Sequence, residues 1–470
     1  MATILGANTL SSGYSIDNSC RFFSNTKMVR TNASTSTNRT QGCFSTWIKK
    51  CNPSGTGGGI ITGYVDASNF SVIYFDSDHR LCFLEYVSGS AAHFLRAPNL
   101  FRDTSAWMHI AYLIDTTQGT AANRIKLYIN GTQITSFHSG GTTQPDQNDT
   151  LLIFTQNSSL DLGQDTSGSP HMLNAYLADT LLVDGATVAI GDLGEFDEDS
   201  PNIWKPKDIS AISVGTNGFR LDYQDSSNLG NAADGGTDLT ETNLAATDQM
   251  TDTPTNNFAT LNPLAWTTGS GITFSEGNLK IANSASDWRP LISTMAVTSG
   301  KWYCEVKVTD IGSASKYGII DVLQYNDNGN LFYNVASGTR AWTYRGFQGK
   351  VYNNTNDAGG ASYGNSFTTN DIIGIYLDCD NNKVYWAKNG TVQNSGTGIS
   401  ITDGYDYGFA FNIYNATCEV NFGSPTWSLS SAVADGNGYG SFEYDPSAGT
   451  FDSASKDFYA LCTKNLAEYG

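Results

Sequence analysis

The chain has 470 residues, of which 15% are charged and 12% aromatic, and it contains 48 glycines. This composition disfavours long helices and favours sheets joined by many tight turns. The formal net charge of −19 argues against nucleic acids and anionic membrane surfaces as partners. No apolar run approaches the ~18 residues that span a bilayer, so we expect no membrane insertion.

Residues 1–225 are predicted to form an antiparallel β-sandwich. Several runs alternate between apolar and polar residues, a period that places one face of a strand on a core and the other toward solvent. A hairpin at 124–134 is predicted around Asn130-Gly131, because both turn positions need a positive φ, which Asn and Gly adopt readily. The other strands are expected at 42–49, 70–75, 80–86, 108–115 and 172–183, with 218–223 as a closing strand.

The character of the sequence changes at 226–270. This segment is rich in turn-forming residues and poor in apolar ones. We therefore expect an extended linker that packs on its neighbours without forming a core of its own.

Residues 271–428 are predicted to form a second sandwich. An apolar strand at 371–378 precedes a second Asn-Gly hairpin at 383–392, centred on Asn389-Gly390, and this hairpin is predicted on the same grounds as the first. Further strands are expected at 279–281, 300–308, 317–323, 407–413 and 418–423. The predicted fold class is therefore all-β, with two tandem antiparallel β-sandwiches.

The C-terminal segment 429–470 is rich in Gly, Ser and Asp but carries several aromatic residues. Aromatic side chains in a polar tail favour docking on a surface over a free terminus. We therefore expect a C-terminal docking tail. The residues concerned are Phe442, Tyr444, Phe451, Phe458 and Tyr459.

The eight cysteines show no Cys-x-x-Cys spacing and are scattered through strand-like sequence. Buried, reduced thiols are the favoured interpretation over disulfides or a zinc site. The amino terminus lacks a basic region followed by an apolar core, so we expect no signal peptide. These features predict a protein made and folded in a reducing cytosol.

Three motifs suggest catalysis or metal binding. The run 195–199, Glu-Phe-Asp-Glu-Asp, resembles the paired carboxylates of β-glucan hydrolases, but its flanks are typical of a loop, and we expect a solvated acidic loop. The run 378–382 has calcium-like spacing without the Gly and Glu that a calcium loop needs, so a hairpin turn is favoured. Calcium binding in the first sandwich stays an open alternative, because its loops carry carboxylates that could bind this ion. These carboxylates belong to Asp66, Asp76 and Asp78. No catalytic residue, metal ligand or other cofactor is predicted.

One group of residues is a candidate binding surface. Aromatic and Arg side chains in Gly- and Asn-rich loops offer a large contact area at a small entropic cost, as sugar- and protein-binding surfaces do. The alternative is that Trp342 and Tyr344 alternate along one strand and fill the sandwich. The candidates are Trp342, Tyr344, Arg345, Tyr352 and Tyr363.

The two predicted sandwiches resemble known families. Three blocks at 299–306, 371–390 and 420–423 resemble the SPRY family, in order and with the expected spacing. That resemblance implies a compact, non-catalytic sandwich that binds partners through loops at one end. The first sandwich is similar to laminin-G and concanavalin-like sandwiches, through blocks at 44–49, 107–111, 125–131 and 173–185.

The whole chain resembles virion structural proteins of tailed phages, through segments at 203–206, 251–263 and 463–469. This resemblance implies a non-enzymatic fibre, appendage or capsid-decoration subunit, assembled in the host cytoplasm and located in the virion. Its expected partners are other virion proteins and a host-surface glycan or protein, and analogy with fibres favours a homo-oligomer, specifically a trimer. A free carbohydrate-binding lectin stays open as an alternative, with a glycan depolymerase less favoured.

Overall fold

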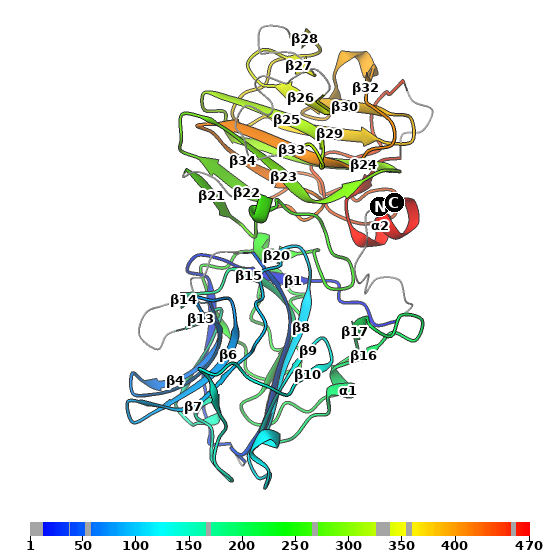
Figure 1. Ribbon diagram of the computed structural model, residues 1–470. Coiled ribbons are helices and arrows are strands. Elements are labelled where there is room, and N and C mark those ends of the chain that lie inside the picture. Colours follow the sequence, from blue (N-terminus) through cyan, green and yellow to red (C-terminus); the bar gives the residue numbers. More distant parts are fainter. Residues whose placement is uncertain are drawn as a thin grey trace. The chain divides into compact units, whose positions relative to one another are not determined.

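The computed structural model describes residues 13–36, 38–51, 58–165, 171–265, 271–325, 339–353, 360–452 and 457–470. The chain divides into two compact units, which we call the first unit (Asn8–Thr255) and the second unit (Asn256–Gly470). Each unit is built mainly from antiparallel strands (Figure 1). The predicted all-β fold class is confirmed.

The first unit consists of two eight-stranded antiparallel sheets, here called sheet A and sheet B. The order in sheet A is β10 (Thr132–Ile134), β9 (Ile125–Ile129), β8 (Met108–Asp115), β3 (Gln41–Lys50), β15 (Ala175–Asp184), β1 (Ser19–Phe22) and β20 (Gln249–Met250), with β18 (Phe219–Leu221) beside β15. The order in sheet B is β11 (Thr142–Thr143), β7 (Ser90–Arg96), β6 (Leu81–Val87), β5 (Asn69–Phe75), β4 (Gly58–Asp66), β12 (Ser159–Leu162), β2 (Lys27–Thr31) and β19 (Thr240–Thr242).

Two pairs of short strands and a few short helical segments complete the described part of the first unit. Strands β13 (Gln164–Asp165) and β14 (His171–Met172) pair with each other, as do β16 (Gly194–Phe196) and β17 (Trp204–Pro206). The helical segments are α1 (Ile190–Leu193), η1 (Ala121–Asn123), η2 (Leu152–Phe154) and η3 (Ala246–Asp248).

The core of the first unit lies between the inner faces of the two sheets. Alternate residues along each strand supply it, as the period of two predicts. Each fully buried Leu, Ile or Phe side chain contributes about 1.5–3 kcal/mol through removal of apolar surface from water. Examples from sheet A are Phe44, Ile48, Ile110 and Tyr112, and examples from sheet B are Ile73, Phe75, Phe83 and Leu95.

A third layer covers the outer face of sheet A. The segment 185–214 runs across this face and contains α1 and the β16–β17 hairpin. Leu193, Ile209 and Val214 from this segment bury the outward-facing Ala111 and Val183 of the sheet. One side of sheet A therefore packs on sheet B and part of the other side packs on this cover.

Both Asn-Gly hairpins form as predicted. Asn130 and Gly131 have φ values of 46° and 73°, and Asn389 and Gly390 have values of 47° and 75°. Gly131 is required for a second reason, because a Cβ atom there would lie 2.2 Å from the Trp204 ring.

The predicted linker is divided between the two units. Strands β19 and β20 pair with β2 and β1 of the first unit, and Leu229 and Leu239 belong to its core. Asp252 then anchors the end of this stretch, because its carboxylate accepts hydrogen bonds from Lys49 Nζ (2.7 Å) and Trp107 Nε1 (2.9 Å). The first unit thus ends near residue 255, about thirty residues beyond the predicted boundary at 225.

The second unit also contains two large sheets, sheet C with nine strands and sheet D with six. The order in sheet C is β21 (Ile272–Ser275), β22 (Lys280–Asn283), β34 (Thr417–Asn421), β24 (Lys301–Asp310), β29 (Ile372–Asp378), β30 (Lys383–Lys388) and β31 (Thr391–Val392), with β32 (Ile399–Ser400) beside β30 and β35 (Tyr459–Ala460) beside β24. The order in sheet D is β23 (Trp288–Val297), β33 (Tyr407–Tyr414), β25 (Ala314–Asp321), β26 (Ala341–Arg345), β27 (Lys350–Tyr352) and β28 (Ala361–Ser362). The helical segments are η4 (Pro263–Ala265), η6 (Asn394–Gly396) and α2 (Thr463–Tyr469).

The C-terminal tail docks on sheet C of its own unit. Its aromatic residues Phe442, Phe451 and Phe458 form one buried cluster with tyrosines of strands β24, β29 and β30. Strand β35 pairs in parallel with β24. The docking that the sequence predicts therefore takes place within the chain.

A buried carboxylate fastens this tail. Glu305 on β24 accepts hydrogen bonds from the amides of Glu443 (3.0 Å) and Tyr444 (2.8 Å). The side chains of Asn421 (3.0 Å) and Tyr303 (3.1 Å) also donate to it. Burial raises the pKa of Glu305 to about 7, against these hydrogen bonds, which favour the charged form.

All eight cysteine side chains are buried and free. This agrees with the predicted reduced thiols. Among the described residues, no helix combines the length and the apolar character needed to cross a bilayer.

We predict that Phe458→Ala lowers the free energy of unfolding of the second unit by about 3–5 kcal/mol, the usual loss for a buried Phe. Phe458 is 0% exposed and contacts the rings of Tyr376 and Phe451. Phe347→Ala is the matched control, because Phe347 is 50% exposed and its removal is expected to change stability by about 0.5 kcal/mol or less. Urea unfolding followed by tryptophan fluorescence measures both. Equal effects of the two substitutions would contradict a docked tail.

We also predict that the second unit becomes less stable as the pH rises toward neutrality. The pKa of Glu305 is raised from its ordinary 4.5 to about 7 in the folded protein, so the folded state binds the proton more tightly than the unfolded state. The contribution of Glu305 to the free energy of unfolding is therefore complete below about pH 4.5. It is lost as the pH rises through about 7, a change of about 3 kcal/mol.

Unfolding measured from pH 4 to pH 8 tests this dependence on Glu305. The variant Glu305→Gln is expected to lose this part of the slope, because a Gln amide does not titrate between pH 4 and pH 8. If the free energy of unfolding has the same pH dependence in the variant and in the parent chain, Glu305 is not the group responsible for it.

Candidate functional site

The structure places the predicted binding residues largely inside the second unit. Trp342, Tyr344, Tyr352 and Tyr363 are between 0% and 5% exposed. Arg345 is half-buried, with its guanidinium over the Trp288 ring. Trp342 and Tyr344 alternate along β26, which matches the alternative that they fill the sandwich. These four aromatic side chains do not form an exposed surface.

The acidic run at 195–199 begins in a short strand and continues into the loop that follows it, where residues 197–199 are largely exposed, as predicted. Glu195 is in β16, which pairs with β17. Its carboxylate lies 3.3 Å from Lys207 Nζ, and Asp197 lies 3.3 Å from Lys205 Nζ. Asp197 also accepts the backbone amides of Asp199 and Ser200. Its carboxylate therefore stabilises the turn of the hairpin.

The loop carboxylates considered for calcium are held by protein groups. Asp66 accepts hydrogen bonds from the Asn69 side chain, while Asp76 and Asp78 bind the two sides of the Arg96 guanidinium at 2.5 and 2.6 Å. Within the described ranges, no three His, Cys, Asp or Glu side chains gather in a way that could hold a metal ion.

A different surface of the first unit has the character of a binding site. The strand register of sheet B places three rows of side chains on its outer face. The first row is Tyr64, Phe70 and Tyr86; the second contains Val72, Leu84 and Phe94; the third contains Tyr74 and Arg96. We call seven of these residues the aromatic face, namely Tyr64, Phe70, Val72, Tyr74, Leu84, Tyr86 and Phe94.

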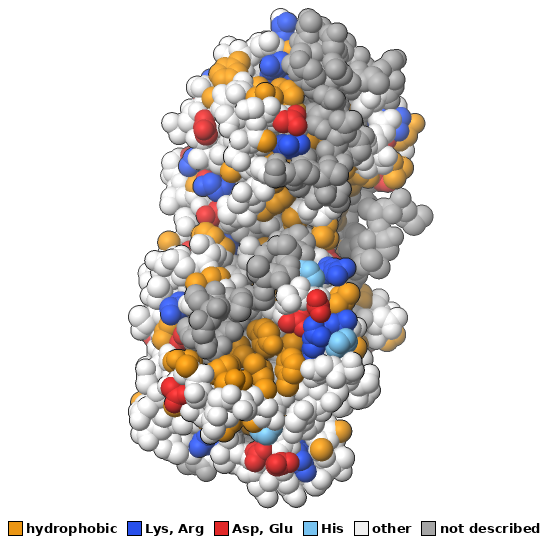
Figure 2. All heavy atoms as spheres, turned by 60° about the vertical axis from the view of Figure 1, so that its left-hand side comes forward, with side chains coloured by type: hydrophobic (Ala, Val, Ile, Leu, Met, Phe, Trp, Pro, Cys, Tyr) orange, Lys and Arg blue, Asp and Glu red, His pale blue; other side chains and the backbone are white. Residues whose placement is uncertain are grey.

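The aromatic face is accessible to solvent. The rings of Phe70 and Tyr86 stack with their centroids 5.1 Å apart and their planes 18° apart. Phe70 and Val72 are buried at its base, whereas Tyr64, Tyr74, Leu84, Tyr86 and Phe94 are half-buried. Figure 2 shows hydrophobic side chains gathered on this side of the first unit, next to a cluster of charged and His side chains.

The polar border of the aromatic face is rigidly organised. Arg96 Nε binds Asp76, and its terminal nitrogens bind Asp78 and contact His138 Nδ1 at 3.2 Å. Burial opposes ionisation of Asp76, but the hydrogen bonds from the Arg80 amide and from Arg96 outweigh it and lower the pKa of Asp76. The border therefore stays charged at neutral pH and positions one side of the aromatic face.

The sequence carried a signal for this surface that was missed. In 70–75, both alternating sets of positions are largely apolar, with Phe70, Val72 and Tyr74 on one face and Ile73 and Phe75 on the other. A strand with one solvated face has polar residues at every second position. Apolar residues on both faces indicate a second contact surface.

Family models match both units. Residues 23–184 match the model of the concanavalin A-like lectin/glucanases superfamily, and residues 301–425 match the SPRY domain model. The chain therefore carries a concanavalin-like domain followed by a SPRY domain. The aromatic face lies within the matched part of the concanavalin-like domain.

The chain is also similar to individual proteins. It is 29% identical over 140 residues to the probable ATP-dependent RNA helicase ddx1 of Dictyostelium discoideum, a match covering 30% of this chain and 17% of that relative. Among solved structures, the SPRY domain of human HERC1 is 16% identical with a TM-score of 0.26, covering 32% of this chain and 91% of that one. A heptameric SAP-like pentraxin from Limulus polyphemus is 16% identical with a TM-score of 0.28, covering 37% of this chain and 79% of that one.

Proposed function

We propose that this chain is a non-enzymatic adhesion protein, and that the aromatic face of its concanavalin-like domain binds a glycan. The observation that carries the proposal is a group of half-buried aromatic rings on the outer face of sheet B. The family description of this domain names lectins and glucanases, which are carbohydrate-directed proteins.

The chemistry of the face suits a saccharide. Sugar rings have apolar faces that pack on aromatic side chains, and Tyr in addition offers a hydroxyl at the edge of each contact. Within the described residues, the hydroxyls of Tyr64 and Tyr86 make no hydrogen bond, so both are available to sugar hydroxyls. Three cross-strand rows provide contacts for several sugar units of a chain.

The wider setting of the proposal rests on the resemblance of the sequence to tailed-phage virion proteins. In that setting the chain is a non-enzymatic fibre, appendage or capsid-decoration subunit, and it assembles with other virion proteins as a homo-oligomer, specifically a trimer. The host-surface glycan or protein is then the partner of the exposed domain.

Two alternatives remain as proposals of other classes. A free lectin would use the same aromatic face without a particle. A glycan depolymerase would need carboxylates that act on the substrate, and Glu195 and Asp197 are the acidic candidates; both are engaged by Lys205 and Lys207. This pairing favours a binding protein over the depolymerase.

We predict that the double substitution Tyr64→Ala/Tyr86→Ala weakens glycan binding about 10-fold or more, since each lost aromatic contact removes on the order of 1 kcal/mol. A glycan array probed with the purified chain identifies the ligand, and calorimetry with that ligand measures the change. Phe347→Ala is the control, because Phe347 is an exposed aromatic residue of the SPRY domain.

The outcomes of this experiment separate the alternatives. Binding that survives the double substitution would place the glycan site elsewhere. Shortening of the bound glycan during incubation would favour the depolymerase and contradict the non-enzymatic proposal.

The virion setting has its own test. Mass spectrometry of purified phage particles, from a host that produces this chain, is expected to find it at a fixed ratio to the major capsid protein. Its presence only in the soluble fraction would support the free lectin.

A further inference from the structure

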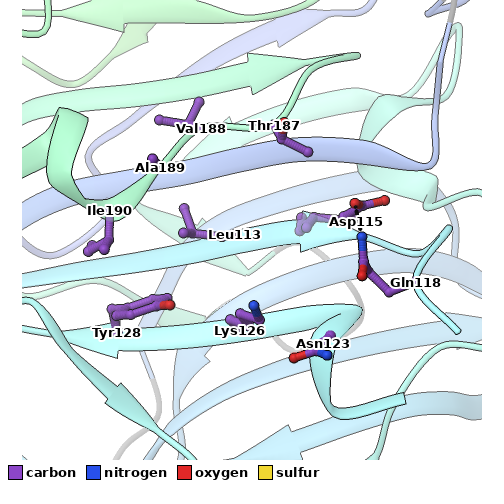
Figure 3. Close-up of a pocket in the computed structure, with 11 residues that line it drawn as sticks. Leu113, Asp115, Gln118, Asn123, Lys126, Tyr128, Thr187, Val188, Ala189 and Ile190 are labelled. Carbon is purple, nitrogen blue, oxygen red and sulfur yellow. Dashed lines mark hydrogen bonds between the residues drawn. The ribbon is translucent and has the colours of Figure 1, made fainter. Parts of the chain in front are cut away.

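A groove lies on the opposite side of the concanavalin-like domain, over the outer face of sheet A. Its volume is about 460 Å³, which is within the usual range for small-ligand sites. Leu113 of β8 and Tyr128 of β9 line it from the sheet, and Val188 and Ile190 line it from the cover segment (Figure 3). The groove therefore has apolar sides and an aromatic ring.

One cation in this groove, Lys126, has no hydrogen bond or ion pair to any residue that the structure describes. Lys126 of β9 pairs in register with Leu113, so both side chains lie on the outer face of the sheet. Lys126 is half-buried, and it is the one lysine of the described first unit without a hydrogen bond or ion pair. The other lysines of this unit bind carboxylates or a backbone carbonyl, namely Lys27, Lys49, Lys50, Lys205 and Lys207.

The end of the groove near Lys126 is polar. Asp115 accepts hydrogen bonds from the amide and hydroxyl of Thr117 and from Gln118 Nε2. These bonds keep the Asp115 carboxylate engaged within its own turn. Asn123 also lines this end (Figure 3), and its side-chain amide makes no hydrogen bond to any described residue.

We propose that this groove binds a sugar unit that carries a carboxylate. The ring packs between Leu113, Tyr128 and the cover segment, and the carboxylate lies at Lys126. The Asn123 amide is placed to bond a ring hydroxyl. Uronic acids and sialic acids share this chemistry, and both are terminal or backbone units of acidic glycans.

The physical argument rests on the combination of features in one groove. Lys126 is a half-buried lysine with no ion pair to any described residue, which favours an anionic ligand. A charge-assisted hydrogen bond is about twice as strong as a neutral one. The side chains of Leu113, Val188 and Ile190 and the Tyr128 ring give the remainder of the ligand an apolar contact surface. Tyr128 is itself fixed, because its hydroxyl bonds Gln133 at 3.3 Å.

Calorimetry with the full chain tests the proposal. The probes are sodium glucuronate, sodium galacturonate and sodium N-acetylneuraminate, with glucose as the uncharged control. At least one carboxylated sugar is expected to bind, and glucose is expected to bind at least about 10-fold more weakly. The variant Lys126→Met is expected to bind the carboxylated sugar about 10-fold more weakly than the parent chain does. The matched control is Lys27→Met, which removes the same charge from a half-buried lysine of β2 in sheet B and is expected to bind as the parent chain does.

Three results would overturn the proposal. They are the absence of binding to every carboxylated probe, equal binding of glucose, and unchanged binding by Lys126→Met. The double substitution Tyr64→Ala/Tyr86→Ala is expected to leave binding of the carboxylated probe unchanged, because the two surfaces lie on opposite sheets. A loss in that variant would place the acidic sugar on the aromatic face and would also contradict the groove.

Discussion

A β-sandwich has two outer sheet faces, and each face must be covered by further chain, remain polar, or bind something else. This constraint governs both domains. In the concanavalin-like domain, the segment 185–214 covers part of sheet A, and in the SPRY domain the C-terminal tail covers sheet C. These segments have little regular structure of their own, and packing on a sheet face is what orders them. The outer face of sheet B is apolar and half-exposed, so it is the face whose composition indicates a partner.

The same constraint explains how the two candidate sites arise. The aromatic face exists because the second set of alternating positions in β5 and β6 is apolar. The groove exists because the cover segment meets sheet A beside β8 and β9, where Lys126 projects from the sheet. One domain thereby presents an aromatic surface suited to several sugar units and a groove suited to one charged unit. The proposed adhesion function gives both surfaces the same kind of ligand.

Local patterns in the sequence predicted much of the fold. Alternation and the Asn-Gly turns located the central strands and both hairpins, because those signals depend on neighbouring residues. The boundary at 225 was misplaced because Leu229 and Leu239 are isolated in a polar stretch and join the core only through long-range packing. The aromatic residues at 342–363 could not be assigned to the surface or the interior from composition, since both environments favour the same side chains. Lys126 was not predicted as a site residue because Val188 and Ile190, which complete its groove, are about sixty residues away in the chain.

The most direct test of the central claim is a crystal structure of the full chain with a glycan that it binds. The account predicts sugar rings lying on the outer face of sheet B, in contact with Tyr64 and Tyr86. A glycan found only on the loops of the SPRY domain, with the aromatic face unoccupied, would contradict it.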